Sequence, residues 1–135
     1  MTLLVDASVW ASLASPGESA HREAKDLLVD SAEVLGALDL TLFELANAVG
    51  VKMGRPERAQ RLFELVAARC GERLVRVDSQ LVTAAVEVAA RHELTAYDAA
   101  YVAVAHRNDW QLVSLDLRDL VSKGLAVTPG AALYP

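Results

Sequence analysis

The chain has 135 residues, 53% hydrophobic and 23% charged, with a formal net charge of −5 at pH 7. This length predicts one folded domain, residues 1–135, and the composition excludes a disordered or fibrous chain. No uncharged run approaches the roughly 18 residues of a membrane span, and the start lacks the basic region of a signal peptide. The lone Cys70 has no second thiol for a disulfide or a zinc site. We therefore expect a cytoplasmic protein without a membrane contact.

The first half of the chain predicts strand, helix, strand and helix in that order. Thr2–Asp6 holds the short apolar run Leu-Leu-Val, whose length favours a buried strand. Behind the turn at Ser15-Pro16-Gly17, apolar residues recur at helical spacing to about Ser31. A second strand is predicted at 34–37, followed by a helix from Thr41 to about Gly54.

The second half continues the alternation. Pro56 fits the first turn of a helix that ends around Cys70-Gly71, and Leu74, Val75 and Val77 suggest a strand. Ser79 can cap the next helix, and the stretch TAYDAAYVAVA at 95–105 is apolar on nearly all sides, which indicates a helix buried in the core. The remaining predicted elements are strands at 110–114 and 125–128 with a short helical or turn stretch at 117–123 between them.

Strands that alternate with helices favour parallel pairing, because each crossover returns the chain to the same end of the sheet. The sequence therefore predicts an α/β fold, a three-layer α/β/α sandwich with a central, mainly parallel sheet. No internal repeat or long linker divides it.

Basic residues are concentrated in one part of this acidic chain. Residues 52–76 carry seven Lys and Arg against three Glu, a balance of +4. One interpretation is a surface that holds a nucleic-acid backbone, for which the candidates are Lys52, Arg55, Arg58 and Arg61. The other is a solvated helix face with spaced ion pairs, such as Glu57 with Arg61.

Four acids lie where a parallel α/β fold binds its ligands, outside the carboxyl ends of the strands. Asp6 follows the first strand and Asp116 follows the strand at 110–114, whereas Glu44 and Asp98 are expected in the first turns of helices. Each acid also has a structural explanation. Thr41 with Glu44 and Thr95 with Asp98 fit capping boxes, and the other two could be caps or turn residues.

Taken together, the four acids create a problem of repulsion. Two carboxylates about 4 Å apart repel by roughly 4 kcal/mol at an effective dielectric near 20, so a cluster requires a cation or raised pKa values. Oxygen ligands without His or Cys select a hard ion, Mg²⁺ or Mn²⁺. Such an ion acidifies water and neutralises a phosphodiester, so the acids predict metal-assisted phosphodiester hydrolysis.

The sequence resembles the PIN-domain ribonucleases over almost its whole length. The matching motifs are LVDAS at 4–8, ELANA at 44–48, YDAAYVAVA at 97–105 and LVSLD at 112–116, in the family's order and spacing. The resemblance is closest to the VapC-like toxins of bacterial toxin–antitoxin modules.

This resemblance implies an endoribonuclease that requires Mg²⁺ or Mn²⁺, with acidic catalytic and metal ligands at Asp6, Glu44, Asp98 and Asp116. It implies that Ser8 and Ser114 orient the carboxylates, although Thr is commoner than Ser at position 114. Asp119 could share or replace the role of Asp116. The implied partners are the RNA substrate, a protein antitoxin and a second copy of the chain in a homodimer.

Several alternatives stay open at this point. The same fold could be a catalytically silent module that binds a basic peptide, or a PIN nuclease of RNA processing that is not a toxin. A phosphatase with an Asp nucleophile is disfavoured by Ser8, where such enzymes carry a second Asp. No glycine-rich phosphate loop indicates a nucleotide cofactor, and three isolated His residues exclude a zinc pair. Tyr97 and Tyr101 fit helix packing better than stacking on an RNA base.

Overall fold

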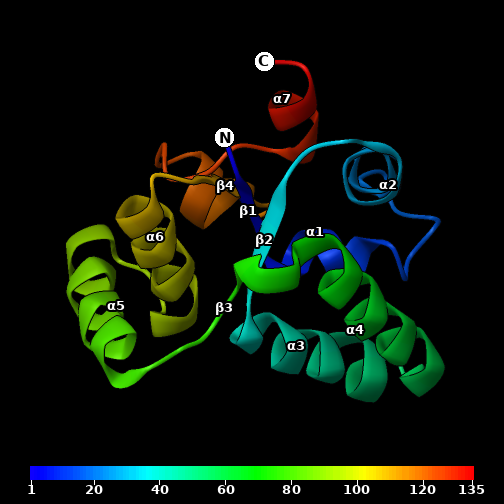
Figure 1. Cartoon of the computed structure of the whole chain (residues 1–135), viewed down its shortest axis with the longest axis horizontal. Coiled ribbons are helices and arrows are strands. Elements are labelled where there is room, and N and C mark those ends of the chain that lie inside the picture. Colours follow the sequence, from blue (N-terminus) through cyan, green and yellow to red (C-terminus); the bar gives the residue numbers. More distant parts are fainter.

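The computed structural model describes all residues, 1–135, and has a parallel four-stranded sheet at its centre (Figure 1). The strands are β1 Leu3–Val5, β2 Leu35–Leu38, β3 Leu74–Val75 and β4 Gln111–Val113. Their order is β3-β2-β1-β4, and every neighbouring pair is parallel. The predicted fold class is confirmed.

Helices cover both faces of the sheet because the short strands are apolar on both sides. In β1, Leu3 and Val5 belong to one hydrophobic core and Leu4 to the other. The first core is covered by α1 Ala7–Ser12, α2 His21–Lys25, α3 Asp39–Leu45, α4 Pro56–Cys70 and the short α7 Pro129–Leu133. The second is covered by α5 Ser79–His92 and α6 Ala96–Asn108.

Three wider turns with π-helical hydrogen bonding extend these elements. They are Asp26–Asp30 after α2, Ala46–Lys52 after α3 and Leu117–Val121 after β4. The first two complete the helices predicted to end near Ser31 and Gly54. No helix of the chain combines the length and the apolar character needed to cross a membrane.

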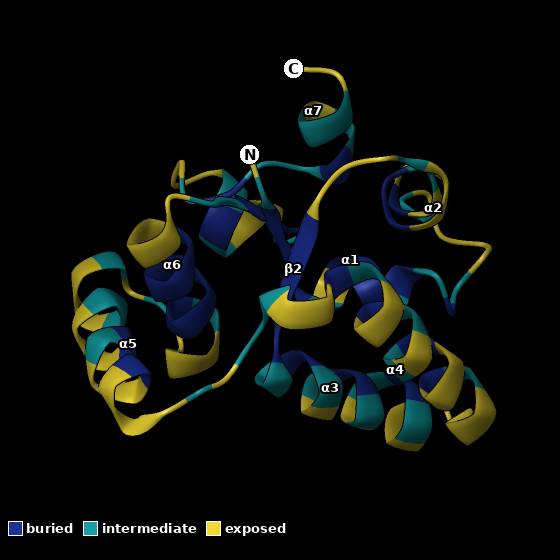
Figure 2. Cartoon of the chain, in the orientation of Figure 1, coloured by how far each residue is buried: buried dark blue, intermediate teal, exposed yellow.

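Helix α6 is the buried helix that its sequence predicts. Every residue from 99 to 105 is buried, whereas α4 and α5 expose one side to solvent (Figure 2). Trp10 is also fully buried in the first core, where its ring nitrogen donates to the Val5 carbonyl oxygen at 3.3 Å.

The predicted start of the helix at Thr41 is wrong. Helix α3 begins at Asp39 with Leu38 at its N-cap, and the Thr41 hydroxyl accepts from the Leu38 backbone N–H at 3.2 Å from inside the helix. The Thr41 side chain therefore supplies a hydrogen-bond partner for the Leu38 N–H at the start of the helix. As a consequence, Glu44 lies in the second turn of α3, so the predicted capping box with Thr41 does not form.

Two further boundaries differ from the sequence prediction. Asp78, not Ser79, caps α5, since its carboxylate accepts from the Leu81 N–H at 2.9 Å and its charge suits a helix start. The predicted strand at 125–128 is reduced to a single parallel bridge between Val113 and Val127, because the chain leaves the sheet edge at once and Thr128 caps α7. Helices α1 and α7 were not predicted.

The basic segment does not carry the ion pair between Glu57 and Arg61. Several of its arginines instead donate to backbone carbonyl oxygens: Arg58 to Ala14 at 2.9 Å, Arg73 to Leu35 at 2.8 Å, and Arg69 to Leu28, Ser31 and Glu33. These three arginines tie α4 and the chain after it to neighbouring elements. Lys52, Arg55 and Arg61 are exposed, and their side chains make no hydrogen bond within the chain.

Candidate active site

The candidate site lies at the carboxyl ends of β1 and its neighbour β4. Strands β1 and β4 pair directly, with Val5 opposite Val113, and the Asp6 N–H donates to the Val113 carbonyl oxygen at 3.1 Å. The pairing brings the residues that follow each strand together. Asp6 and Ser8 come from the β1 side, and Ser114 and Asp116 come from the β4 side.

Asp6 is a buried carboxylate, 5% exposed, at the N-cap of α1. One of its oxygens accepts from both the N–H of Ser8 at 3.1 Å and the hydroxyl of Ser8 at 2.5 Å. Burial raises the pKa of Asp6 to about 6; the hydroxyls of Ser114 and Ser8 oppose this increase, and the negative charges of Asp98 and Glu44 add to it. Hydrogen bonding therefore offsets only part of the cost of burying this charge.

The two serines join the ends of β1 and β4. Ser8 donates to Asp6 and accepts from the Leu115 N–H at 3.0 Å, and Ser114 accepts from the Asp116 N–H at 3.0 Å. Both hydroxyls thus fix the backbone from which the acids project. The orienting role expected for Ser8 and Ser114 stays a prediction.

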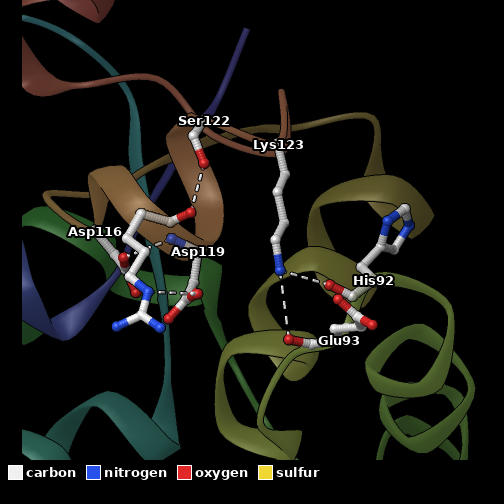
Figure 3. Close-up of polar contacts among 7 residues, drawn as sticks. His92, Glu93, Asp116, Asp119, Ser122 and Lys123 are labelled. Carbon is white, nitrogen blue, oxygen red and sulfur yellow. Dashed lines mark hydrogen bonds and ion pairs between the residues drawn. The ribbon is translucent and has the colours of Figure 1, made fainter.

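Asp116 caps the turn Leu117–Val121 that follows β4. One carboxylate oxygen accepts from the Asp119 N–H at 2.9 Å (Figure 3), while the Asp119 carboxylate lies 4.0 Å from the Arg118 guanidinium. The Lys123 ammonium donates to the carbonyl oxygens of His92 and Glu93, which attaches the end of this turn to the end of α5. Asp116 keeps a free oxygen, and it has no basic partner.

Glu44 is held by a hydrogen-bonded chain that begins on the sheet. Thr41 accepts from the Leu38 N–H and shares a 2.7 Å hydrogen bond with the Tyr101 hydroxyl, which donates to the Glu44 carboxylate at 2.7 Å. Burial, opposed by the Tyr101 hydrogen bond and reinforced by the charge of Asp98, raises the pKa of Glu44. Burial also raises the pKa of Tyr101 well above its usual range, so Tyr101 remains a donor.

Sequence reasoning missed Thr41 and Tyr101 as parts of the site. The expectation of helix packing holds for Tyr101, which is buried, but Tyr97 is exposed. One signal was available: Tyr101 lies three residues after Asp98, so both face the same side of α6.

Tyr101→Phe is expected to lower the free energy of unfolding by about 1 to 2 kcal/mol, because Glu44 loses a hydrogen bond from a buried donor. Tyr97→Phe on the same helix is the control, since Tyr97 is exposed and its hydroxyl makes no hydrogen bond within the chain. Urea unfolding of both variants measures the difference. An equal effect of the two changes would show that the Tyr101 hydroxyl does not support Glu44.

Asp98 lies in the first turn of α6, whose cap Thr95 accepts from the Asp98 N–H at 3.2 Å. Burial raises the pKa of Asp98, and the charges of Asp116 and Asp119 raise it further. Asp98 in turn raises the pKa values of Asp6 and Glu44. Asp98 is therefore the acid that interacts with all the others.

No basic side chain neutralises this group of acids. The chain forms three ion pairs, and none of them includes Asp6, Glu44, Asp98 or Asp116. No three His, Cys, Asp or Glu side chains form a ready-made metal site in this conformation. The four acids thus interact through their charges, without a counter-ion from the protein.

The basic residues predicted to bind RNA lie outside the elements that carry the four acids. Lys52 ends the turn after α3, Arg55 precedes α4, and Arg58 and Arg61 are on α4. One guanidinium nitrogen of Arg58 donates to the Ala14 carbonyl oxygen.

The lone cysteine is unrelated to the site: Cys70 is buried, and burial raises the pKa of its thiol to about 11.

Comparison with known proteins gives a consistent result. Residues 3–122 match the family described as PIN domain. Ribonuclease VapC3 of Pyrobaculum aerophilum is 35% identical over 134 residues, which cover 96% of this chain and 100% of that protein.

Two solved structures share the fold. A toxin–antitoxin complex from Klebsiella pneumoniae contains a chain with a TM-score of 0.72 and 22% identity, covering 94% of this chain and 97% of that one. The sarcin–ricin-loop-cleaving toxin VapC20 of Mycobacterium tuberculosis gives a TM-score of 0.71 and 23% identity, with 90% and 95% covered.

Proposed function

The chain belongs to the PIN-domain family and is a ribonuclease of that family; we propose that it cleaves RNA phosphodiester bonds with the help of Mg²⁺ or Mn²⁺. The observation that carries this proposal is the set of acids around Asp98. They come from four separate parts of the fold and have no basic partner. The charge of Asp98 raises the pKa values of Asp6 and Glu44, and the charge of Asp116 raises the pKa of Asp98.

The side chains present fit a hard divalent cation. The candidate ligands are all carboxylate oxygens, and a buried acid such as Asp6 with a raised pKa is stabilised by a nearby positive charge. Asp6 and Asp98 would hold the ion, and Glu44 and Asp116 would complete its surroundings directly or through water. When bound, Mg²⁺ or Mn²⁺ supplies charge neutralisation at the phosphodiester and a more acidic water.

The protein's own residues position these groups. Ser8 fixes Asp6, the chain from Thr41 through Tyr101 fixes Glu44, and Ser114 fixes the backbone of Asp116. The exposed Lys52, Arg55 and Arg61 would attract the RNA backbone, which makes binding weaker at high salt. Water would attack phosphorus directly as one phosphorus–oxygen ester bond breaks, without a covalent protein intermediate.

We propose further that the chain is the toxin of a toxin–antitoxin module, forms a homodimer and is inhibited by a protein antitoxin. The toxin role and the antitoxin partner are supported by the 35% identity to Ribonuclease VapC3 and by the likeness to a chain of a toxin–antitoxin complex. The presence of an adjacent short gene for a DNA-binding protein, and binding of its product to this chain, would test the partner.

Incubation of single-stranded RNA with the purified chain tests the activity. Cleavage is expected with Mn²⁺ or Mg²⁺ and is expected to disappear in excess EDTA, because no basic residue of the site can replace the cation. Equal cleavage in EDTA would contradict metal dependence, and no cleavage with either metal would contradict the proposed activity.

A further inference from the structure

Two exposed aromatic side chains border a pocket beside the active-site acids. Phe43, on α3, is 80% exposed and directly precedes Glu44; Tyr97, on α6, is 62% exposed and directly precedes Asp98. Both line a cavity of about 370 Å³, completed by Leu40, Glu44 and Asn47. One wall of this pocket is therefore a proposed catalytic carboxylate.

The lining combines aromatic faces with groups that form hydrogen bonds. Phe43 and Tyr97 offer apolar π-surfaces, and the amide of Asn47 can both donate and accept hydrogen bonds. The volume is at the lower end of the range of about 300 to 1,000 Å³ for small-ligand pockets. A flat ring with polar edges is the ligand that this lining suits.

We propose that this pocket, called here the Phe43–Tyr97 pocket, binds an unpaired nucleobase of the RNA next to the phosphate that is cleaved. The inference rests on the proposed function, which brings a phosphodiester to Glu44 and Asp98. A base that is unstacked from single-stranded RNA stacks on aromatic side chains and forms hydrogen bonds through its edge. Tyr97 and Phe43 are then the stacking residues, and Asn47 contacts the edge of the base.

The main competing occupant is a second copy of the chain. Leu40 and Tyr97 also line an adjoining apolar cavity of about 240 Å³, which a partner's side chain could enter. However, a protein contact over the Phe43–Tyr97 pocket would bury Glu44 and Asn47, and charged residues are depleted from interface cores. A nucleobase leaves the Glu44 carboxylate free for its role at the phosphate.

Binding of RNA to a cleavage-deficient protein tests the pocket separately from catalysis. The protein carries Asp98→Asn, and Mg²⁺ is present. The two probes are fluorescein-labelled strands of equal length, one of oligo(A) and one of abasic ribose-phosphate, and fluorescence anisotropy measures their binding. Tyr97→Leu and Phe43→Leu are each expected to weaken oligo(A) binding roughly 5- to 100-fold, because one stacked base is lost. Binding of the abasic strand should not change.

Tyr134→Leu is the matched control, since Tyr134 is 75% exposed and follows α7, at the opposite end of the molecule from α3 (Figure 1). It should leave both affinities unchanged. All three positions are exposed, so the melting temperatures should also stay equal.

Three results would overturn the proposal. The first is an Asp98→Asn protein that binds oligo(A) and the abasic strand with equal affinity, and the second is Tyr97→Leu and Phe43→Leu variants that bind oligo(A) as tightly as their parent. The third is a Phe43→Leu variant that changes from a dimer to a monomer in light scattering and keeps its RNA affinity. The third result would assign the pocket to a second copy of the chain. Failure of the wild type to cleave RNA, with base-dependent binding intact, would contradict the proposed catalysis and leave the pocket standing.

Discussion

Asp6→Asn is expected to stabilise the metal-free protein by about 2 to 3 kcal/mol at pH 8 and to change its stability little near pH 4. The folded protein raises the pKa of Asp6 from 3.8 to about 6, and each unit corresponds to about 1.4 kcal/mol. Below about pH 4 the carboxyl is protonated in both the folded and the unfolded chain. As the pH rises from about 4 through about 6, the free energy of unfolding falls, because the unfolded chain ionises Asp6 freely whereas the folded chain must ionise it in a buried position.

Asparagine removes the charge and keeps the hydrogen bonds from Ser8. Its amide oxygen can still accept from the N–H and hydroxyl of Ser8, which now bond to Asp6. Urea unfolding in EDTA at pH 4, 6 and 8 gives the free-energy differences. Asp78→Asn is the control: Asp78 caps α5 and is exposed, and Asn caps a helix about as well as Asp. If Asp6→Asn destabilised the protein at pH 8, Asp6 would be a structural cap whose charge the fold needs.

Asp98→Asn is expected to reduce metal-dependent RNA cleavage at least about 100-fold while the protein stays folded. The charge of Asp98 acts on Asp6 and Glu44 and is itself acted on by Asp116, so its loss is expected to weaken the binding of a cation among them. The backbone bond from Asp98 to the Thr95 hydroxyl is kept in the variant, because it uses the main-chain N–H. Initial rates at saturating Mn²⁺, together with melting temperatures, measure the effect.

Asp109→Asn provides the matched control on the same helix. Asp109 is exposed at the C-terminal end of α6 with a φ of 55°, a left-handed conformation that Asn tolerates well. Its cleavage rate should equal that of the wild type. If Asp98→Asn and Asp109→Asn were equally active, Asp98 would have no role in catalysis.

The parts of the site set by chain order were predictable from the sequence. Asp6 directly follows β1 and Asp116 lies three residues after the end of β4, and parallel strands bring their carboxyl ends to one edge. The buried helix α6 was equally clear, because its apolar residues surround the helix axis and a solvated helix would expose them.

Contacts between distant residues were not predictable in the same way. Tyr101 bonds to Glu44 and Thr41, which are 57 and 60 positions away, and no local pattern specifies such pairs. The local pattern of Thr41 and Glu44 was misleading, because a capping box and this network use the same residue types. The sequence also did not distinguish the basic side chains that face solvent from those of Arg58, Arg69 and Arg73, which donate hydrogen bonds to carbonyl oxygens elsewhere in the fold.

Calorimetric titration of the wild type and of Asp98→Asn with Mn²⁺ at pH 8 tests most directly whether carboxylates from separate elements form one cation site. We expect saturable binding by the wild type, accompanied by a higher melting temperature, and binding at least about 10-fold weaker by Asp98→Asn. Equal affinities for the two proteins, or no binding of Mn²⁺ to the wild type, would contradict this account.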